Sequence, residues 1–132
     1  MEVEADVKGA VIGLGVDLVE VERFGDLLRR HKKALARLFA AEELAYTETL
    51  ANPVPSLAAR FAAKEATMKA LQVGLGSFDW TDVAVERAPS GAPTLLVRGR
   101  AERLAATRGV AGWLVSLSHI DSVAAATVVA CS

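Results

Sequence analysis

The chain has 132 residues, a length that suits one domain with a single core. Apolar residues make up 52% of it but aromatic residues only 5%, so the core must be built mainly from alanine and aliphatic side chains. The net charge of −1 argues against a general nucleic-acid binder. The longest apolar stretches, 123–126 and 128–131, are far shorter than the roughly 20 residues of a membrane span, so we expect no membrane association.

The two ends of the chain bear on its location. The first ten residues are partly acidic and lack the basic and apolar segments of a secretory signal. We expect residues 1–10 to form a flexible extension and residues 11–132 to form a single domain. Cys131 is the only cysteine, so no intrachain disulfide or multi-cysteine metal site can form. These features favour a cytoplasmic protein.

The first predicted element is a buried strand over residues 11–17, VIGLGVD. Gly13 and Gly15 within it predict that another backbone segment approaches closely. Residues 20–39 then show apolar side chains at helical spacing, with a break expected at 31–33.

The rest of the chain alternates between helices and short strands. Two prolines in ANPVPS interrupt the helical pattern, and Ser56 is the predicted N-cap of the helix that follows. Short hairpin connections imply antiparallel strand pairing. We therefore expect an α+β domain with a largely antiparallel sheet packed against a long helix. The predicted elements are helices at 40–50, 57–72 and 100–108, the last ended by Gly109, and strands at 82–87, 93–99, 112–119 and 122–131.

The long helix contains the stretch RFAAKEATMKAL, in which two charges interrupt apolar residues. At about 100° per residue, Lys64 falls in the middle of the apolar stripe and Glu65 on its edge, beside Lys69. In a structural interpretation, Lys64 extends its ammonium outward and Glu65 pairs with Lys69 four residues later. In a functional one, the edge borders a polar cleft where a carboxylate binds a cation and lysines bind anionic oxygen. The helix alone leaves both open.

Asp17 is the second candidate cation ligand. A carboxylate that ends a strand and faces a helix can share Mg²⁺ with Glu65, because this ion is commonly held by one or two carboxylates plus phosphates and water. The alternative is that Asp17 caps the next helix. The preceding G-x-G is not a dinucleotide fingerprint, because Leu18 stands where the third glycine is required.

Two further segments carry polar groups. Between residues 23 and 37 six bases accompany one acid, which indicates either an acidic partner or a solvated face. No aromatic residues are interleaved for stacking on nucleotides, so we expect no nucleic-acid binding. In SLSH, Ser118 and His119 could hold a phosphate or nucleobase or relay a proton, or they could be surface residues.

Taken together, GLGVDLVEVERF, RFAAKEATMKAL and VSLSH resemble the small holo-acyl-carrier-protein synthases, a group of 4′-phosphopantetheinyl transferases. The resemblance covers about residues 11 to 131. It implies the fold of that family and Mg²⁺-dependent transfer of 4′-phosphopantetheine from coenzyme A to a serine of an apo acyl carrier protein, with release of adenosine 3′,5′-bisphosphate. It also implies a homotrimer with sites between subunits.

The resemblance also implies roles for single residues. Asp17 and Glu65 match the pair that holds Mg²⁺ against the pyrophosphate of coenzyme A, and Lys69 matches a lysine that faces the phosphates. These three are the expected catalytic residues. Arg60 and His119 match positions near the nucleotide. The surface that receives the carrier corresponds to Arg23 with its neighbours Arg29 and Arg30.

One turn departs from the family pattern. Gln72 and Val73 stand where the family usually has a glycine-rich turn after the long helix. Gly74 is expected to keep part of the backbone contact with coenzyme A, and Ser118 is a further expected contact.

Two rival functions remain at this stage. A Mg²⁺-dependent hydrolase of nucleotide pyrophosphates could use the same acids without a basic docking helix. A catalytically silent nucleotide-binding module would fit the altered turn. The sequence identifies neither the carrier's pathway nor the group that accepts the serine proton.

Overall fold

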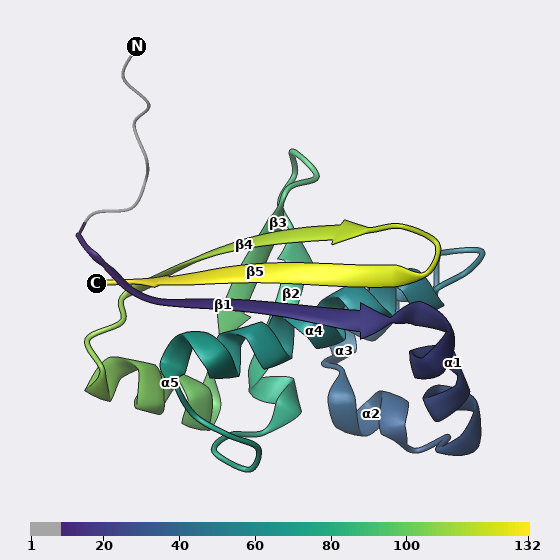
Figure 1. The fold of residues 1–132 in the computed structure, drawn as a ribbon, viewed down its shortest axis with the longest axis horizontal. Coiled ribbons are helices and arrows are strands. Elements are labelled where there is room, and N and C mark those ends of the chain that lie inside the picture. Colours follow the sequence, from purple (N-terminus) through teal and green to yellow (C-terminus); the bar gives the residue numbers. More distant parts are fainter. Residues whose placement is uncertain (1–8) are drawn as a thin grey trace.

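The computed structural model describes residues 9–132; the N-terminal extension expected over residues 1–10 lies almost wholly outside the described residues. The described residues form five strands and five α-helices (Figure 1). In order they are β1 (Val11–Glu20), α1 (Val21–Arg30), α2 (Ala34–Leu38), α3 (Ala41–Thr47), α4 (Val54–Leu71), the 3₁₀ turn η1 (Trp80–Asp82), β2 (Val83–Arg87), β3 (Pro93–Val97), α5 (Gly99–Thr107), β4 (Gly112–His119) and β5 (Val123–Cys131).

All strand pairs are antiparallel, as predicted, but the strands divide between two sheets. A three-stranded sheet has the order β1-β5-β4, and β2 pairs with β3 in a separate hairpin. The α+β class with a long helix on the sheet is confirmed. The long helix α4 packs on the larger sheet and also contacts β2 of the hairpin.

The helices lie on one side of the three-stranded sheet (Figure 1). Small side chains on the inner face of β5, such as Ala126 and Ala130, are buried against alanines of α4, including Ala62 and Ala66. Alanine therefore predominates in this contact, as the composition predicted. A second buried cluster joins α4 to α5 and β2. No helix in the described part of the chain combines the length and apolar character that crossing a bilayer requires.

Several predicted boundaries differ from the structure. The break at 31–33 is confirmed, and it separates α1 from α2. The long helix begins at Val54 instead of residue 57, because Pro55 occupies the first turn, where no backbone N–H is needed for the helix. Ser56 is therefore inside α4 and is not its N-cap. β1 extends to Glu20, three residues beyond the predicted end.

The opposite face of the three-stranded sheet is apolar and exposed. Side chains alternate along β1, and Gly13, Gly15 and Asp17 face α4. The even-numbered residues 14, 16 and 18 therefore point away from α4. Leu14, Val16 and Leu18 are exposed by 61%, 50% and 67%, and Leu114 of β4 by 48%. A contiguous apolar surface of this kind usually marks an interaction site.

Candidate active site

The two glycines of β1 allow α4 to lie unusually close to the strand. A β-carbon at Gly15 would sit 1.8 Å from the carbonyl oxygen of Ala66, and one at Gly13 would sit 1.9 Å from that of Ala70. Both contacts are with helix backbone, which cannot move aside as a side chain can. The prediction that another segment approaches these glycines is confirmed, and the close approach aligns Asp17 with the polar edge of α4.

Asp17 lies within β1 and faces α4. Its Oδ1 accepts a hydrogen bond from the ammonium of Lys69 at 2.9 Å, and the same ammonium donates to the carbonyl of Val16 at 3.0 Å. The alternative role of Asp17 as a helix cap is wrong, because Glu20 occupies the N-cap position of α1. Lys69 therefore pairs with Asp17 and does not form the expected i,i+4 pair with Glu65 in the described structure.

Glu65 lies one turn before Lys69 on α4 and is half-buried. Burial raises the pKa of Glu65, and the nearby negative charge of Asp17 and a hydrogen bond with it raise this pKa further, while Lys69 partly opposes them. Two carboxyl groups in mutual contact, with one lysine beside them, form a site where negative charge is only partly compensated.

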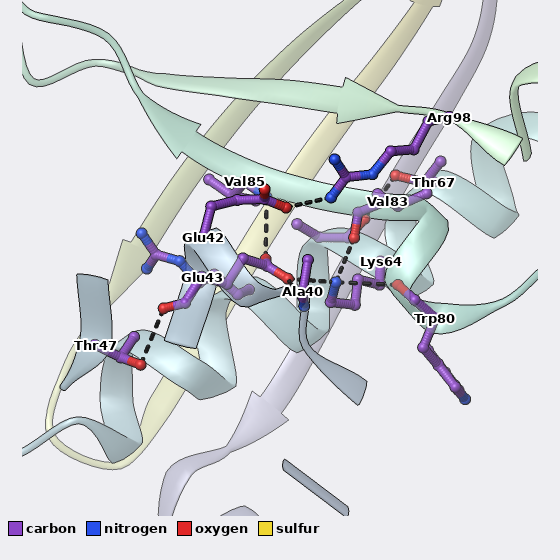
Figure 2. Close-up of polar contacts among 12 residues, drawn as sticks. Ala40, Glu42, Glu43, Thr47, Lys64, Thr67, Trp80, Val83, Val85 and Arg98 are labelled. Carbon is purple, nitrogen blue, oxygen red and sulfur yellow. Dashed lines mark hydrogen bonds and ion pairs between the residues drawn. The ribbon is translucent and has the colours of Figure 1, made fainter. Parts of the chain in front are cut away.

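Lys64, the residue before Glu65, points into the core. It is fully buried, so the interpretation that it extends its ammonium outward is wrong. The ammonium donates to Glu43 Oε1 at 2.7 Å and to the carbonyl of Trp80 at 3.1 Å, and it also donates to the carbonyl of Val83 (Figure 2). Burial lowers the pKa of Lys64, and the Glu43 carboxylate opposes this shift.

Glu43 completes the buried pair. Its Oε1 also accepts from the backbone amide of Ala40, and its Oε2 accepts from the amide of Val85, both at 3.0 Å. The pair thereby connects α3, α4 and β2 through bonds that satisfy each charged group (Figure 2). The adjacent residues Lys64 and Glu65 therefore point in different directions. Lys64 lies in the core, and Glu65 lies at the polar edge of α4.

Arg60 and His119 line a second site, a pocket of about 520 Å³ between α3, α4, the β2–β3 hairpin and β4. Arg60 is 3% exposed, and burial lowers its pKa. Its Nη1 donates to the side-chain and backbone oxygens of Ser56. The structure therefore places these two predicted nucleotide-site residues on one pocket.

The acidic site and the Arg60 pocket lie on different sides of α4. Glu65 follows Arg60 by five residues, which rotates it about 140° around the helix axis. The sheet register agrees, because Asp17 of β1 pairs with Ala126 of β5, which pairs in turn with Leu117 of β4 at the pocket. Within one chain the two sites flank the helix.

Two other expected contacts lie apart from both sites. Ser118 and His119 are successive residues of β4, so their side chains point to opposite faces of the sheet. Ser118 is therefore directed to the exposed apolar face. Gly74 lies in the exposed turn after α4, where a β-carbon would meet no atom within 4 Å. At the departure from the family turn, Gln72 adopts the left-handed conformation, with φ of 57°.

The basic helix α1 borders the acidic site. Phe24 stacks on Phe61 of α4 with ring centroids 5.0 Å apart, which fixes α1 against the long helix. Arg23 is exposed and lines, with Glu65, a cavity of about 290 Å³. Arg29 and Arg30 are exposed in the last turn, and Arg29 pairs with Asp26. Of the predicted partner-binding arginines, Arg23 therefore lies next to the acidic site, and Arg29 and Arg30 lie further along α1.

The acid pair fits a divalent cation. Carboxylate oxygens are the ligands that Mg²⁺ prefers, and a cation between Asp17 and Glu65 would relieve the repulsion that raises the pKa of Glu65. Residues 9–132 contain no group of three or more side chains suited to hold a metal. A cation here would therefore need oxygens from substrate or water, as expected for Mg²⁺ at a phosphate.

Sequence reasoning missed Glu43, the partner of Lys64, and it missed Tyr46 and Arg87, which line the Arg60 pocket and are joined by a hydrogen bond. Glu43 precedes its partner Lys64 by 21 residues, and Arg87 follows Tyr46 by 41 residues. No local spacing signals contacts over such separations. The one available signal was the charge of Lys64 within an apolar helix stripe, and it left open whether the ammonium extends outward or has a buried partner.

Comparison with known proteins gives the same family as the resemblance of the three sequence motifs. The sequence profile of the 4′-phosphopantetheinyl transferase superfamily matches residues 13–128. The chain is 46% identical over 112 residues to a holo-[acyl-carrier-protein] synthase of Moorella thermoacetica, covering 85% of this chain and 88% of that protein.

Solved structures agree. The crystal structure of the holo-[acyl-carrier-protein] synthase from Neisseria meningitidis matches with a TM-score of 0.84 at 29% identity, over 93% of this chain and 100% of that one. The Helicobacter pylori enzyme, solved in complex with coenzyme A, matches with a TM-score of 0.78 at 28% identity, over 89% and 98%. The chain belongs to the 4′-phosphopantetheinyl transferase superfamily, and within it to the holo-[acyl-carrier-protein] synthases.

Proposed function

We propose that this protein transfers 4′-phosphopantetheine from coenzyme A to a serine of an apo acyl carrier protein. The observation that carries the assignment to particular residues is the contact of Asp17, Glu65 and Lys69 where β1 meets α4. The serine oxygen forms a bond to the β-phosphorus, and the bond from that phosphorus to the bridging oxygen breaks. Adenosine 3′,5′-bisphosphate leaves with the electron pair, and the serine loses its proton.

The chain contributes mainly positioning and charge, as phosphoryl transfer requires. Asp17 and Glu65 would hold Mg²⁺, which when bound neutralises charge on the diphosphate. Lys69 is 56% exposed beside Asp17 and can reach a phosphate oxygen while it orients that carboxylate. The backbone of Gly74 and the hydroxyl of Ser118 are proposed as further contacts to coenzyme A.

The active unit is proposed to be a homotrimer with sites between subunits. The exposed face that contains Leu14, Val16 and Leu18 supports this, because a surface of such apolar character favours burial. The position of the Arg60 pocket supports it too, since α4 separates this pocket from the acids of the same chain. Light scattering should give a trimer, and Val16→Glu should dissociate it; a monomeric wild type would overturn the proposal.

The carrier is proposed to dock on α1. Arg23 lies beside Glu65, and Arg29 and Arg30 extend the positive surface along the helix, which suits an acidic partner. Residues 11–132 are proposed to act as one transferase domain, and a cytoplasmic location is proposed from the single cysteine.

Mass spectrometry of an apo acyl carrier protein tests the function. Incubation with this protein, coenzyme A and Mg²⁺ should add one phosphopantetheine to the carrier, and chelation of Mg²⁺ should prevent it. Consumption of coenzyme A without modification of the carrier would indicate a pyrophosphate hydrolase. Binding without either reaction would indicate a silent module.

A further inference from the structure

The segment after α4 is fixed at its two ends and exposed between them. Phe78 is 3% exposed and belongs to the buried cluster that joins α4 to α5 and β2, and Val73 packs against the same cluster. Residues 74–76 between them are exposed. Within residues 74–77 of the described chain, the backbone makes one hydrogen bond of its own, from the Ser77 amide to the Gly74 carbonyl at 3.4 Å. A segment with so few contacts needs a further partner to keep one conformation.

Arg100 of α5 is that partner. Its Nη2 donates to the carbonyls of Gly76 and Ser77 at 2.9 and 3.1 Å, and its Nη1 donates to Asp79 Oδ1 at 3.5 Å. Three acceptors from one loop thus meet a single guanidinium, whose planar donors have a fixed arrangement. Gly76 has a φ of 89°, which a residue with a side chain rarely adopts. The guanidinium therefore binds the segment in one particular conformation.

The position of this guanidinium is fixed in turn. The next residue, Ala101, is fully buried, and its amide donates to Asp82 Oδ2 at 3.4 Å. The same oxygen accepts from the amide of Asp79 at 3.2 Å, which joins the first turn of α5 to the end of the segment. At the other end of α5, Arg108 donates to the carbonyl of Leu71, the last residue of α4. Contacts at both ends of α5 therefore hold the chain that leaves α4.

The two arginines also change the electrostatics at this end of α4. The last carbonyls of a helix carry partial negative charge, which disfavours an anion nearby. Lys69, the proposed phosphate contact, lies in this last turn. Arg108 binds the carbonyl of Leu71, and Arg100 binds two carbonyls of the segment that follows. Their positive charges therefore make the region more favourable for an anionic donor.

The proposed function assigns the backbone of Gly74 to coenzyme A, and Gly74 lies at the start of this exposed segment. We propose that Arg100 is a positioning residue for coenzyme A, which acts by holding residues 74–77 in the conformation that receives the donor. A segment ordered in advance avoids the entropic cost of ordering when the donor binds. This proposal rests on the proposed function and adds a residue of α5, which belongs to none of the three sequence motifs.

The kinetics of Arg100→Met test the proposal. Methionine keeps a long apolar side chain but has no donor for the carbonyls. Because fixing the backbone of one residue corresponds to about tenfold in affinity, we expect the KM for coenzyme A to rise about tenfold, with kcat nearly unchanged. A general loss of structure would lower kcat and Tm instead. Arg100→Lys keeps the charge and should recover part of the loss. Arg103→Met, at an exposed arginine of the same helix, is the matched control and should leave the KM unchanged.

Two measurements that need no transfer reaction separate this proposal from the proposed function. Hydrogen exchange should become faster at the amides of residues 74–78 in Arg100→Met and stay unchanged in the middle of α4. Calorimetric titration should show about tenfold weaker binding of coenzyme A. Unchanged exchange would show that Arg100 does not hold the segment, and faster exchange with unchanged binding would show that its order does not serve the donor. Either result overturns the proposal, whether or not the protein transfers phosphopantetheine.

Discussion

Gly15 of β1 lies against the carbonyl oxygen of Ala66 of α4, at a separation that leaves no room for a side chain. A β-carbon on Gly15 would be 1.8 Å from this oxygen. Since Asp17 is two residues further along the same face of the strand, this close approach sets the separation between Asp17 and the acid of α4.

Gly15→Ala should therefore affect both stability and activity. The helix must move away from β1, so we expect a loss of about 2 kcal/mol or more in the free energy of unfolding, with loss of transfer by the folded fraction. Gly112→Ala is the control, because a β-carbon there meets no atom within 4 Å. Urea denaturation of both variants measures the difference; equal stability would show that the helix adapts without cost.

Asp17→Asn tests the proposed metal pair. The amide keeps the size of the side chain but removes its charge, so it should bind Mg²⁺ and Lys69 poorly. We expect transfer to fall at least about 100-fold with little change in Tm. The assay is carrier modification across a range of Mg²⁺ concentrations. Normal activity at ordinary Mg²⁺ would exclude Asp17 as a ligand.

Glu65→Gln should change how stability depends on pH. Burial and Asp17 raise the pKa of Glu65 in the folded protein, so folding favours the protonated carboxyl. This contribution is fully present below the unfolded pKa of about 4.5 and is lost as the pH rises through the folded value. At pH 7 the ionised Glu65 therefore destabilises the fold, and Glu65→Gln should have the higher Tm.

The difference in Tm should shrink as the pH falls toward 4. Mg²⁺ should raise the Tm of the wild type more than that of Glu65→Gln, because only the carboxylate binds the ion well. Thermal unfolding from pH 4 to 8, with and without Mg²⁺, measures both effects. A lower Tm for Glu65→Gln at pH 7 would contradict the proposed repulsion with Asp17.

Lys64→Met should lower the stability of the protein, whereas Glu65→Gln should raise it at pH 7. Its removal leaves the Glu43 carboxylate buried without a counter-charge, which typically costs 3–5 kcal/mol. Because Lys64 faces the core, the variant should still transfer phosphopantetheine at temperatures where it is folded. A double-mutant cycle with Glu43→Gln should give a coupling of about 1 kcal/mol or more. Additive losses would mean that the pair contributes little as a pair.

Charge reversal on α1 tests the docking surface. Arg23→Glu combined with Arg29→Glu should raise the KM for the carrier about tenfold and strengthen its dependence on salt, while the KM for coenzyme A stays nearly the same. Arg103→Glu on α5 is the control for a general change in charge. An unchanged KM for the carrier would place the docking surface elsewhere.

The local pattern of the sequence determined much of the acidic site. The glycines at 13 and 15 predicted a close backbone contact, and the helical period placed Glu65 and Lys69 on one edge of α4. The same period put Lys64 in the apolar stripe, but it could not show whether the ammonium turned outward or found a buried partner. Asp17 likewise had two possible roles until the length of β1 was known.

The tertiary structure decided what lies across these elements. It placed Glu43 against Lys64, Tyr46 between Arg60 and Arg87, and Lys69 on Asp17, which is 52 residues earlier. Periodicity constrains only which face of one element a residue occupies, whereas these contacts depend on how separate elements pack. For this reason the sequence determined the faces of β1 and α4, and only the packed structure determined which side chains meet between them.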